Sequence, residues 1–227
     1  MKTVQLAAPL RLRERLLTQG VQHLSDSELL AIFISAGSGQ RSCTQLAHDL
    51  LRQFGDLRAV LNADLKQFCQ VAGLGPVRYV QLQALKEICR RSDFISLQKE
   101  TSLNHQNQTF AYLKRQLRDN KHETFAAIFL DSQNRVLGYE ELFKGSINSA
   151  TIHTRPIIEK VMQYNAAALI LAHNHPSGVC RASQEDIQVT RQLQQALHCI
   201  DVRLLDHVVV GDNQVYSILA ETTSICH

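Results

Sequence analysis

Apolar residues at helical spacing dominate residues 11–91 of the chain. The segment from Ser25 to Glu28 precedes the apolar run LLAIFI and is typical of a capping box at the start of a helix. Further amphipathic stretches read TQLAHDLLRQF, ADLKQFCQV and VRYVQLQALKEICRR, and glycines separate them. The pattern predicts an all-helical N-terminal domain over residues 1–95.

The pattern changes in the segment SDFISLQKETSLNHQNQ, residues 92–108, which is rich in Ser, Asn, Gln and charged residues. Such a segment is long for a loop inside one compact domain and favours a domain boundary. We therefore predict a linker over residues 96–108.

Residues 109–227 combine short apolar runs with amphipathic stretches. TFAAIFL and VLGYEELF flank Ser132-Gln133-Asn134 and indicate a hairpin, and AAALILAHNH is typical of a buried central strand. IHTRPIIEKVMQYN and SQEDIQVTRQLQQALHCI indicate helices, and two strands close the chain. The predicted order β-β-α-β-α-β-β defines a mixed α/β domain.

Composition supports a globular protein, with 44% hydrophobic and 20% charged residues. The chain has no apolar run of bilayer length and no N-terminal signal peptide pattern, so we expect a cytoplasmic protein without a membrane partner. None of the six cysteines forms a C-x-x-C pair, which suits reduced cysteines in that compartment.

Charge is unevenly distributed along the chain. Residues 1–95 contain 12 Lys and Arg against 8 Asp and Glu, a net +4, whereas residues 96–227 contain 12 against 13, a net −1. The basic half is a mild indication of an anionic partner such as DNA.

The run HNHPSGVCRASQED contains the strongest chemical signal. His173 and His175 lie two residues apart at the end of a predicted strand, so their imidazoles project from the same face. Asp186 follows in the first turn of the next predicted helix. Two imidazoles and one carboxylate form a three-ligand site that leaves a position for water, as in catalytic zinc sites; aspartate also suits manganese or iron.

A purely structural interpretation of the same residues exists. Ser183-x-x-Asp186 before an apolar helix resembles a capping box, with Ser183 as the N-cap. Cap and ligand are compatible, because a cap makes the turn that presents the ligand rigid. Cys180 is a weaker candidate ligand, and His207 is interpreted as a core histidine in preference to a residue that orients a ligand.

In the helical half, Gly73-Leu74-Gly75 separates two predicted helices and resembles a helix-hairpin-helix. Glycines there let backbone amides approach a DNA phosphate, and Arg78 adds a cation. The alternative is a tight turn that needs glycine for its dihedral angles, or a protein-docking module. Further cations that suit DNA are Arg11, Arg13 and Arg15.

The pattern H-x-H-x7-S-x2-D resembles the JAMM (MPN-plus) metalloprotease signature. LILAHNHPSG, LLDHVVVG and IFLDSQNRVLGYEELFKGSIN further resemble the RadC family of bacterial proteins, long labelled DNA-repair proteins, and the resemblance covers nearly the whole chain. Two departures are Ala182, where the family usually has Pro, and the C-terminal ETTSICH. Neither changes a candidate ligand.

The resemblance implies a JAMM/MPN-like (cytidine-deaminase-like) α/β domain over residues 109–227 with one zinc ion. It also implies an upstream glutamate as general acid and base, for which Glu123 fits better than Glu140 or Glu141, and Ser183 as an oxyanion donor. The implied function is hydrolysis of a peptide or isopeptide bond in a protein substrate. The alternatives are a DNA-binding accessory protein with a non-catalytic metal site and a metal-dependent nuclease.

Overall fold

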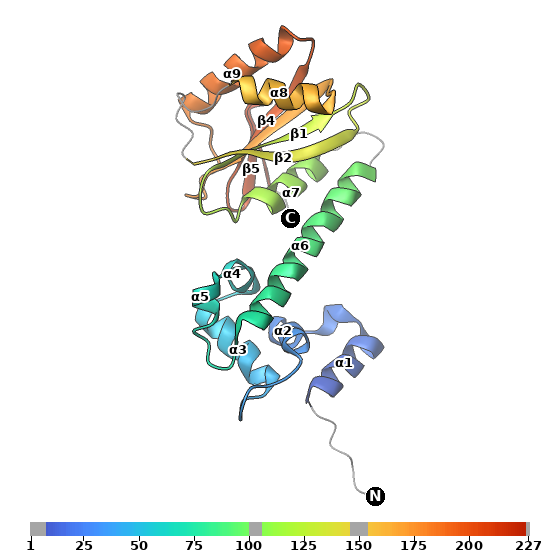
Figure 1. Cartoon of the computed structure of the whole chain (residues 1–227), viewed down its shortest axis with the longest axis vertical. Coiled ribbons are helices and arrows are strands. Elements are labelled where there is room, and N and C mark those ends of the chain that lie inside the picture. The colour runs from blue at the N-terminus through green and yellow to red at the C-terminus, as the bar shows by residue number, and fades with distance from the viewer. Residues whose placement is uncertain (1–7, 100–105, 146–153, 226–227) are drawn as a thin grey trace, which may run out of the picture. The chain divides into compact units, whose positions relative to one another are not determined.

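The computed structural model describes residues 8–99, 106–145 and 154–225 (Figure 1). The chain divides into two units, Met1–Cys89 and Arg90–His227, each with its own core. None of the helices in the described ranges is both long enough and apolar enough to cross a membrane.

The described part of the first unit is helical, as the apolar spacing predicts. Helices α2, α3 and α5 begin at capping boxes whose N-cap residues are Ser25, Ser42 and Asp64. The elements are α1 (Ala8–Gln19), a 3-10 turn (Val21–His23), α2 (Asp26–Ile34), α3 (Cys43–Phe54), α4 (Leu57–Asn62), α5 (Leu65–Phe68) and the start of α6 (Pro76–Lys99).

The core of this unit forms where α2 packs on α3. Leu46, Ala47 and Leu50 lie on one face of α3 and are fully buried, and Phe68 of α5 is buried with them. Burial of one large apolar side chain stabilises a fold by about 1.5–3 kcal/mol. This apolar face therefore accounts for the association of helices that are individually too short to be stable.

The second unit is built on one six-stranded sheet with the strand order β2-β1-β3-β4-β5-β6. Only β3 and β4 are parallel among these neighbours; the other pairs are antiparallel. The elements are α7 (Gln106–Leu117), β1 (Thr124–Leu130), β2 (Val136–Lys144), α8 (Thr154–Tyr164), β3 (Ala168–Asn174), α9 (Gln184–His198), β4 (Arg203–Val210), β5 (Gln214–Ser217) and β6 (Thr222–Ile225).

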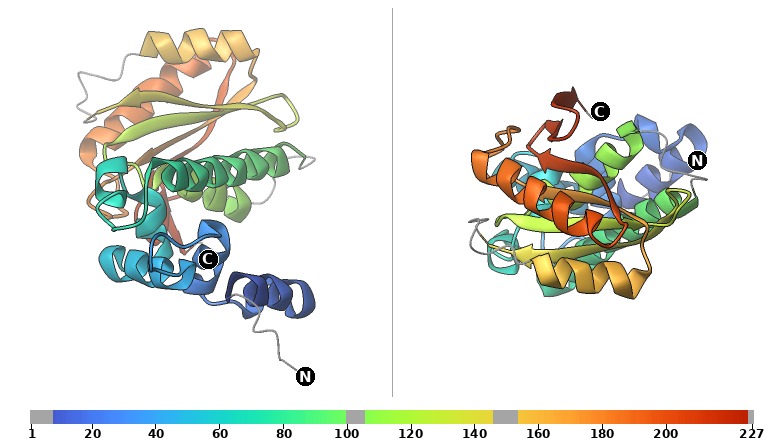
Figure 2. Two further views of the ribbon diagram at one scale, coloured as in Figure 1. Left: turned by 60° about the horizontal axis from the view of Figure 1, so that its bottom comes forward. Right: turned by 90° about the horizontal axis from the view of Figure 1, so that it is seen from above.

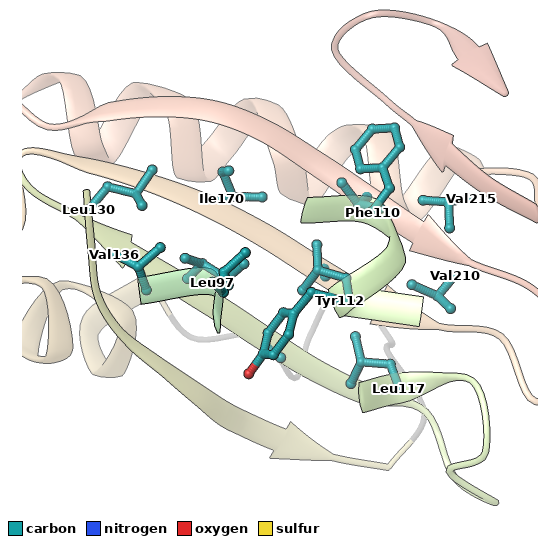
Figure 3. Close-up of a cluster of buried hydrophobic side chains, with 14 of the residues drawn as sticks. Leu97, Phe110, Tyr112, Leu117, Leu130, Val136, Ile170, Val210 and Val215 are labelled. Atoms are coloured by element: carbon teal, nitrogen blue, oxygen red, sulfur yellow. The ribbon is translucent and has the colours of Figure 1, made fainter. Parts of the chain in front are cut away.

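Helices cover both faces of this sheet, which makes a mixed α/β sandwich (Figures 1 and 2). On β1, Phe125 and Phe129 pack in a cluster with α8 and α9. The alternate residues Ile128 and Leu130 pack in the opposite cluster with α7 and the last turns of α6 (Figure 3). Burial on both faces follows from the two-residue period of a strand, and every residue of β1 and β3 is buried, most of them apolar.

The structure differs from the predicted linker at residues 96–108. Residues 96–99 belong to α6 and residues 106–108 belong to α7, while residues 100–105 lie outside the described part. The division between the two units falls inside α6, after Cys89. The polar composition was misleading because a few apolar residues, such as Leu97 and Phe110, are enough to anchor these helices on the sheet.

Candidate metal centre

β3 positions the first candidate ligand. His173 lies near the end of the strand, paired with Phe125 of β1 on one side and Val209 of β4 on the other. Its side chain is fully buried. Because alternate residues face opposite sides, His173 points to the face covered by α9, and Asn174 points away from it.

The next two ligands come from the loop after β3 and from the start of α9. His175 follows the strand, and its backbone N–H donates to the carbonyl oxygen of Val210. Ser183 is the N-cap of α9, and Asp186 occupies the third helical position of a complete capping box. The capping box fixes Asp186 in the first turn of α9. From there its carboxylate contacts His173 near the end of β3.

The structure brings together the three ligands that the sequence predicts. One candidate ligand atom from each of His173, His175 and Asp186 lies within 4.8 Å of the others. The two Nε2 atoms are 3.1 Å apart, and Asp186 Oδ1 and Oδ2 lie 3.2 Å and 3.6 Å from the Nε2 atoms of His173 and His175, respectively.

Electrostatics at this cluster favour a cation. Burial by itself raises the pKa of Asp186, but the contacts of its carboxylate with the imidazoles of His173 and His175 outweigh that effect and hold the pKa well below its usual range. The Asp186 carboxylate in turn favours the protonated form of the His175 imidazole and so raises the pKa of His175. A carboxylate that stays ionised while buried requires positive charge nearby, which a metal ion supplies.

The donor set fits a metal ion. His175 Nδ1 lies 3.0 Å from the carbonyl oxygen of Val179, which only accepts hydrogen bonds, so Nδ1 carries the proton. The lone pair of His175 is then on Nε2, the atom that faces His173 and Asp186. A second partner that fixes the orientation of an imidazole in this way is typical of metal ligands.

Glu123 immediately precedes β1 and is half-buried. The neighbouring residue Thr124 donates its backbone N–H to the side-chain oxygen of Asn174, at 2.8 Å, and the Asn174 amide donates to the carbonyl oxygen of Asn120. The negative charge of Glu123 is one cause of the raised pKa of His175. The start of β1 thus brings Glu123 close enough to the candidate ligands to act electrostatically on His175.

The two competing glutamates form ion pairs on a different strand from the candidate ligands. Glu140 and Glu141 lie on β2, on the far side of β1 from the ligand strand. Glu140 accepts from the Tyr164 hydroxyl at 2.8 Å and pairs with Lys160, and Glu141 pairs with Lys144. These contacts favour Glu123 as the glutamate of the site.

Ser183 makes two contacts with the same residue. Its hydroxyl donates to Asp186 Oδ2 at 2.7 Å and accepts from the Asp186 backbone N–H at 3.1 Å. The single hydroxyl proton is therefore used by a ligand carboxylate in this structure. The arrangement assigns Ser183 to holding Asp186, and its predicted role as an oxyanion donor stays a prediction.

Two further residues, Cys180 and His207, lie close to the candidate ligands. The Cys180 thiol donates to the Val209 carbonyl oxygen, and Cys180 is not a member of the described ligand group. His207 of β4 is fully buried, with Nε2 2.9 Å from His173 Nδ1, so it contacts a candidate ligand directly. The preferred interpretation of His207 as a core histidine missed this contact, because the sequence does not show that β4 lies beside β3.

The N-terminal turn has the conformation that glycine permits. Gly73 has a φ of +95°, and a Cβ there would approach Leu46 and Ser38 within 3.0 Å. A Cβ placed on Gly75 meets no atom of the described residues within 4 Å. Arg78 instead donates to the carbonyl oxygens of Ile34 and Ala36, so its guanidinium stabilises the end of α2.

Fold and site together define a class, the JAB-type α/β domain with a histidine and aspartate group that could hold a metal ion. Residues 103–223 match the RadC-like JAB domain family, and residues 4–80 match the UPF0758 N-terminal family. The chain belongs to the RadC-like JAB family. A UPF0758 protein of Legionella pneumophila (strain Corby) is 60% identical over 227 residues, covering 100% of both chains. A UPF0758 protein of Cellvibrio japonicus is 48% identical over 208 residues, covering 92% of this chain and 93% of its own.

Proposed function

We propose that the protein is a zinc-dependent hydrolase of the JAMM type that cleaves a peptide or isopeptide bond. The observation that carries the proposal is the buried convergence of His173, His175 and Asp186 within a RadC-like JAB domain. The JAB class includes metalloproteases, and the chain has the JAMM-type fold of metal-dependent hydrolases.

Zinc held by these three residues would supply a Lewis acid and a water whose pKa is lowered to about 7. Glu123 takes the proton of the attacking water and delivers it to the leaving nitrogen as the carbon–nitrogen bond breaks. Asn174 fixes the backbone next to Glu123, and Ser183 fixes the Asp186 carboxylate. General acid–base catalysis at such a site contributes about 10²- to 10⁴-fold in rate.

Removal of the metal tests this proposal. We expect the purified protein to contain about one zinc ion per chain and to cleave a member of a peptide and isopeptide panel. Dialysis against a chelator should abolish cleavage, and zinc should restore it. Metal content is measured by atomic emission and cleavage by mass spectrometry of the products.

The other outcomes of that experiment identify the alternatives. Stoichiometric metal with no cleavage of peptides or DNA would favour an accessory protein with a non-catalytic site. Chelator-sensitive cleavage of DNA would favour a nuclease. Protein without metal affinity would contradict the zinc site itself.

We further propose that the N-terminal unit binds the DNA backbone at the turn between Gly73 and Gly75. Support comes from the open space at Gly75, from the start of α6 directly after it, and from the net +4 charge of residues 1–95. Backbone amides at the start of a helix suit phosphate oxygens, and here the amides of Gly75 and Val77 are proposed, because Pro76 has no N–H and the Arg78 N–H donates to the Gly75 carbonyl oxygen. Because Arg78 is engaged with α2, the proposal rests on these amides and not on that guanidinium.

We expect the full-length protein to bind duplex DNA with an affinity that falls as salt concentration rises. Gly75→Asp places a carboxylate near the phosphate and should weaken binding about fivefold, since a repulsion of about 1 kcal/mol is typical at solvent-exposed distances. Gln19→Glu in α1 adds the same charge at an exposed position away from the turn and is the control. Fluorescence anisotropy in a salt series measures the DNA affinity of both variants. Equal affinity of Gly75→Asp and wild type would exclude the turn at Gly75 as the DNA-binding surface.

A further inference from the structure

A chain of three hydrogen-bonded side chains connects α9 to the ligand His173. Thr190 of α9 and His207 of β4 are both buried. Thr190 Oγ1 lies 2.6 Å from His207 Nδ1, and His207 Nε2 lies 2.9 Å from His173 Nδ1. Both ring nitrogens of His207 are therefore engaged in contacts with polar atoms.

The backbone carbonyl of Asp186 determines which atoms donate and which accept along this series of hydrogen bonds. Thr190 Oγ1 also lies 2.6 Å from the Asp186 carbonyl oxygen, which can only accept a hydrogen bond. The single hydroxyl proton of Thr190 is thus donated to Asp186. Toward His207 the hydroxyl oxygen can only accept, so His207 Nδ1 carries a proton and donates it.

The remaining protons follow from this first one. A neutral imidazole has one donor and one acceptor, so His207 Nε2 is the acceptor and His173 Nδ1 is the donor. The lone pair of His173 is then on Nε2, which faces Asp186 Oδ1 and His175 Nε2. The carbonyl of Val179 imposes the same tautomer on His175 from the other side of the site.

We propose that Thr190 and His207 are positioning residues that hold His173 in the Nδ1–H tautomer, with its Nε2 lone pair directed to the metal position. This inference rests on the metal site of the proposed function. Any buried imidazole needs partners for its ring nitrogens, and for His207 one of those partners is the candidate ligand His173 itself. Thr190 lies one helical turn after Asp186, so the same helix face supplies a ligand and the start of the chain that orients another ligand.

A matched pair of substitutions at Thr190 tests the inference. Thr190→Val keeps the shape of the side chain and removes the hydroxyl, whereas Thr190→Ser keeps the hydroxyl. We expect Thr190→Val to lower zinc affinity about 10- to 100-fold, the usual range for loss of an outer partner of a ligand, and Thr190→Ser to restore most of it. His207→Phe, which keeps a buried ring, should reproduce the loss. Competition with a chromophoric chelator measures the affinity.

A second readout does not need the metal or any hydrolysis. In the ¹⁵N-labelled metal-free protein, long-range ¹H–¹⁵N spectra show which ring nitrogen of each histidine carries the proton. We expect the Nδ1–H form of His173 in wild type and Thr190→Ser, and a mixture of tautomers in Thr190→Val. Unfolding temperatures of all variants separate lost packing from lost orientation.

The results distinguish this inference from the proposed function. If Thr190→Val unfolds at a lower temperature but keeps wild-type zinc affinity and the wild-type His173 tautomer, the residue only packs and the inference is overturned. If the wild-type protein binds zinc and cleaves no peptide, the proposed function fails. The zinc affinities and the His173 tautomer of the variants still decide the roles of Thr190 and His207.

Discussion

Asp186→Asn is expected to yield a folded protein whose zinc affinity is at least about 100-fold lower than that of wild type and whose hydrolysis is undetectable. The carboxylate is the one anionic ligand in the described group, and it contacts both imidazoles. Its loss removes the charge that balances a divalent cation in a buried site. The amide oxygen of asparagine still accepts from the Ser183 backbone, so the start of α9 is preserved.

Glu185→Gln is the matched control for this substitution. It removes one negative charge from the same helical turn, but Glu185 is exposed and is not a member of the ligand group. Zinc content by atomic emission, the helical signal by circular dichroism and hydrolysis by mass spectrometry should all match wild type. An Asp186→Asn protein that retains one zinc per chain would show that Asp186 is a helix cap only.

Glu123→Gln is expected to retain zinc and to lose about 10²- to 10⁴-fold in turnover, the contribution of a general acid and base. Glutamine keeps the size of the side chain but cannot take a proton from water. Because Glu123 lies beside the cluster and not within the ligand group, metal affinity should change little. Turnover is measured on the best substrate of the peptide and isopeptide panel.

Glu140→Gln and Glu141→Gln are the controls for this second prediction. Both residues lie on β2 and pair with lysines, so their substitution should leave turnover close to that of wild type. If Glu123→Gln kept full activity and either control lost most of it, the proton transfer would be assigned to that glutamate of β2. Loss of zinc from Glu123→Gln would instead make Glu123 a ligand.

The sequence predicts those parts of the site that depend on local geometry. A two-residue spacing on a strand puts His173 and His175 on one side, and a three-residue spacing at a helix start creates the Ser183–Asp186 cap. The structure has the complete capping box, a local rule that holds regardless of how the elements pack. β3 ends at Asn174, so the strand rule covers His173, whereas His175 lies just after the strand and is held by its backbone hydrogen bond to Val210 of β4.

Local composition was less informative at the predicted linker. A polar segment is helical at both described ends because Leu97 and Phe110 pack on the sheet, and that packing partner is distant in sequence. Helix formation by a weakly apolar segment depends mostly on such tertiary contacts.

Only the tertiary structure decides which residues act on the ligands from other elements. The sheet order places β1 and β4 on either side of β3, which brings Glu123 beside the site and His207 within 2.9 Å of His173. It also places the hydroxyl of Thr190 between Asp186 and His207. The Thr190–His207 and His207–His173 contacts join residues 17 and 34 positions apart, respectively. The periodicity of a strand or helix states which face a residue occupies, but the pairing of strands determines what that face meets.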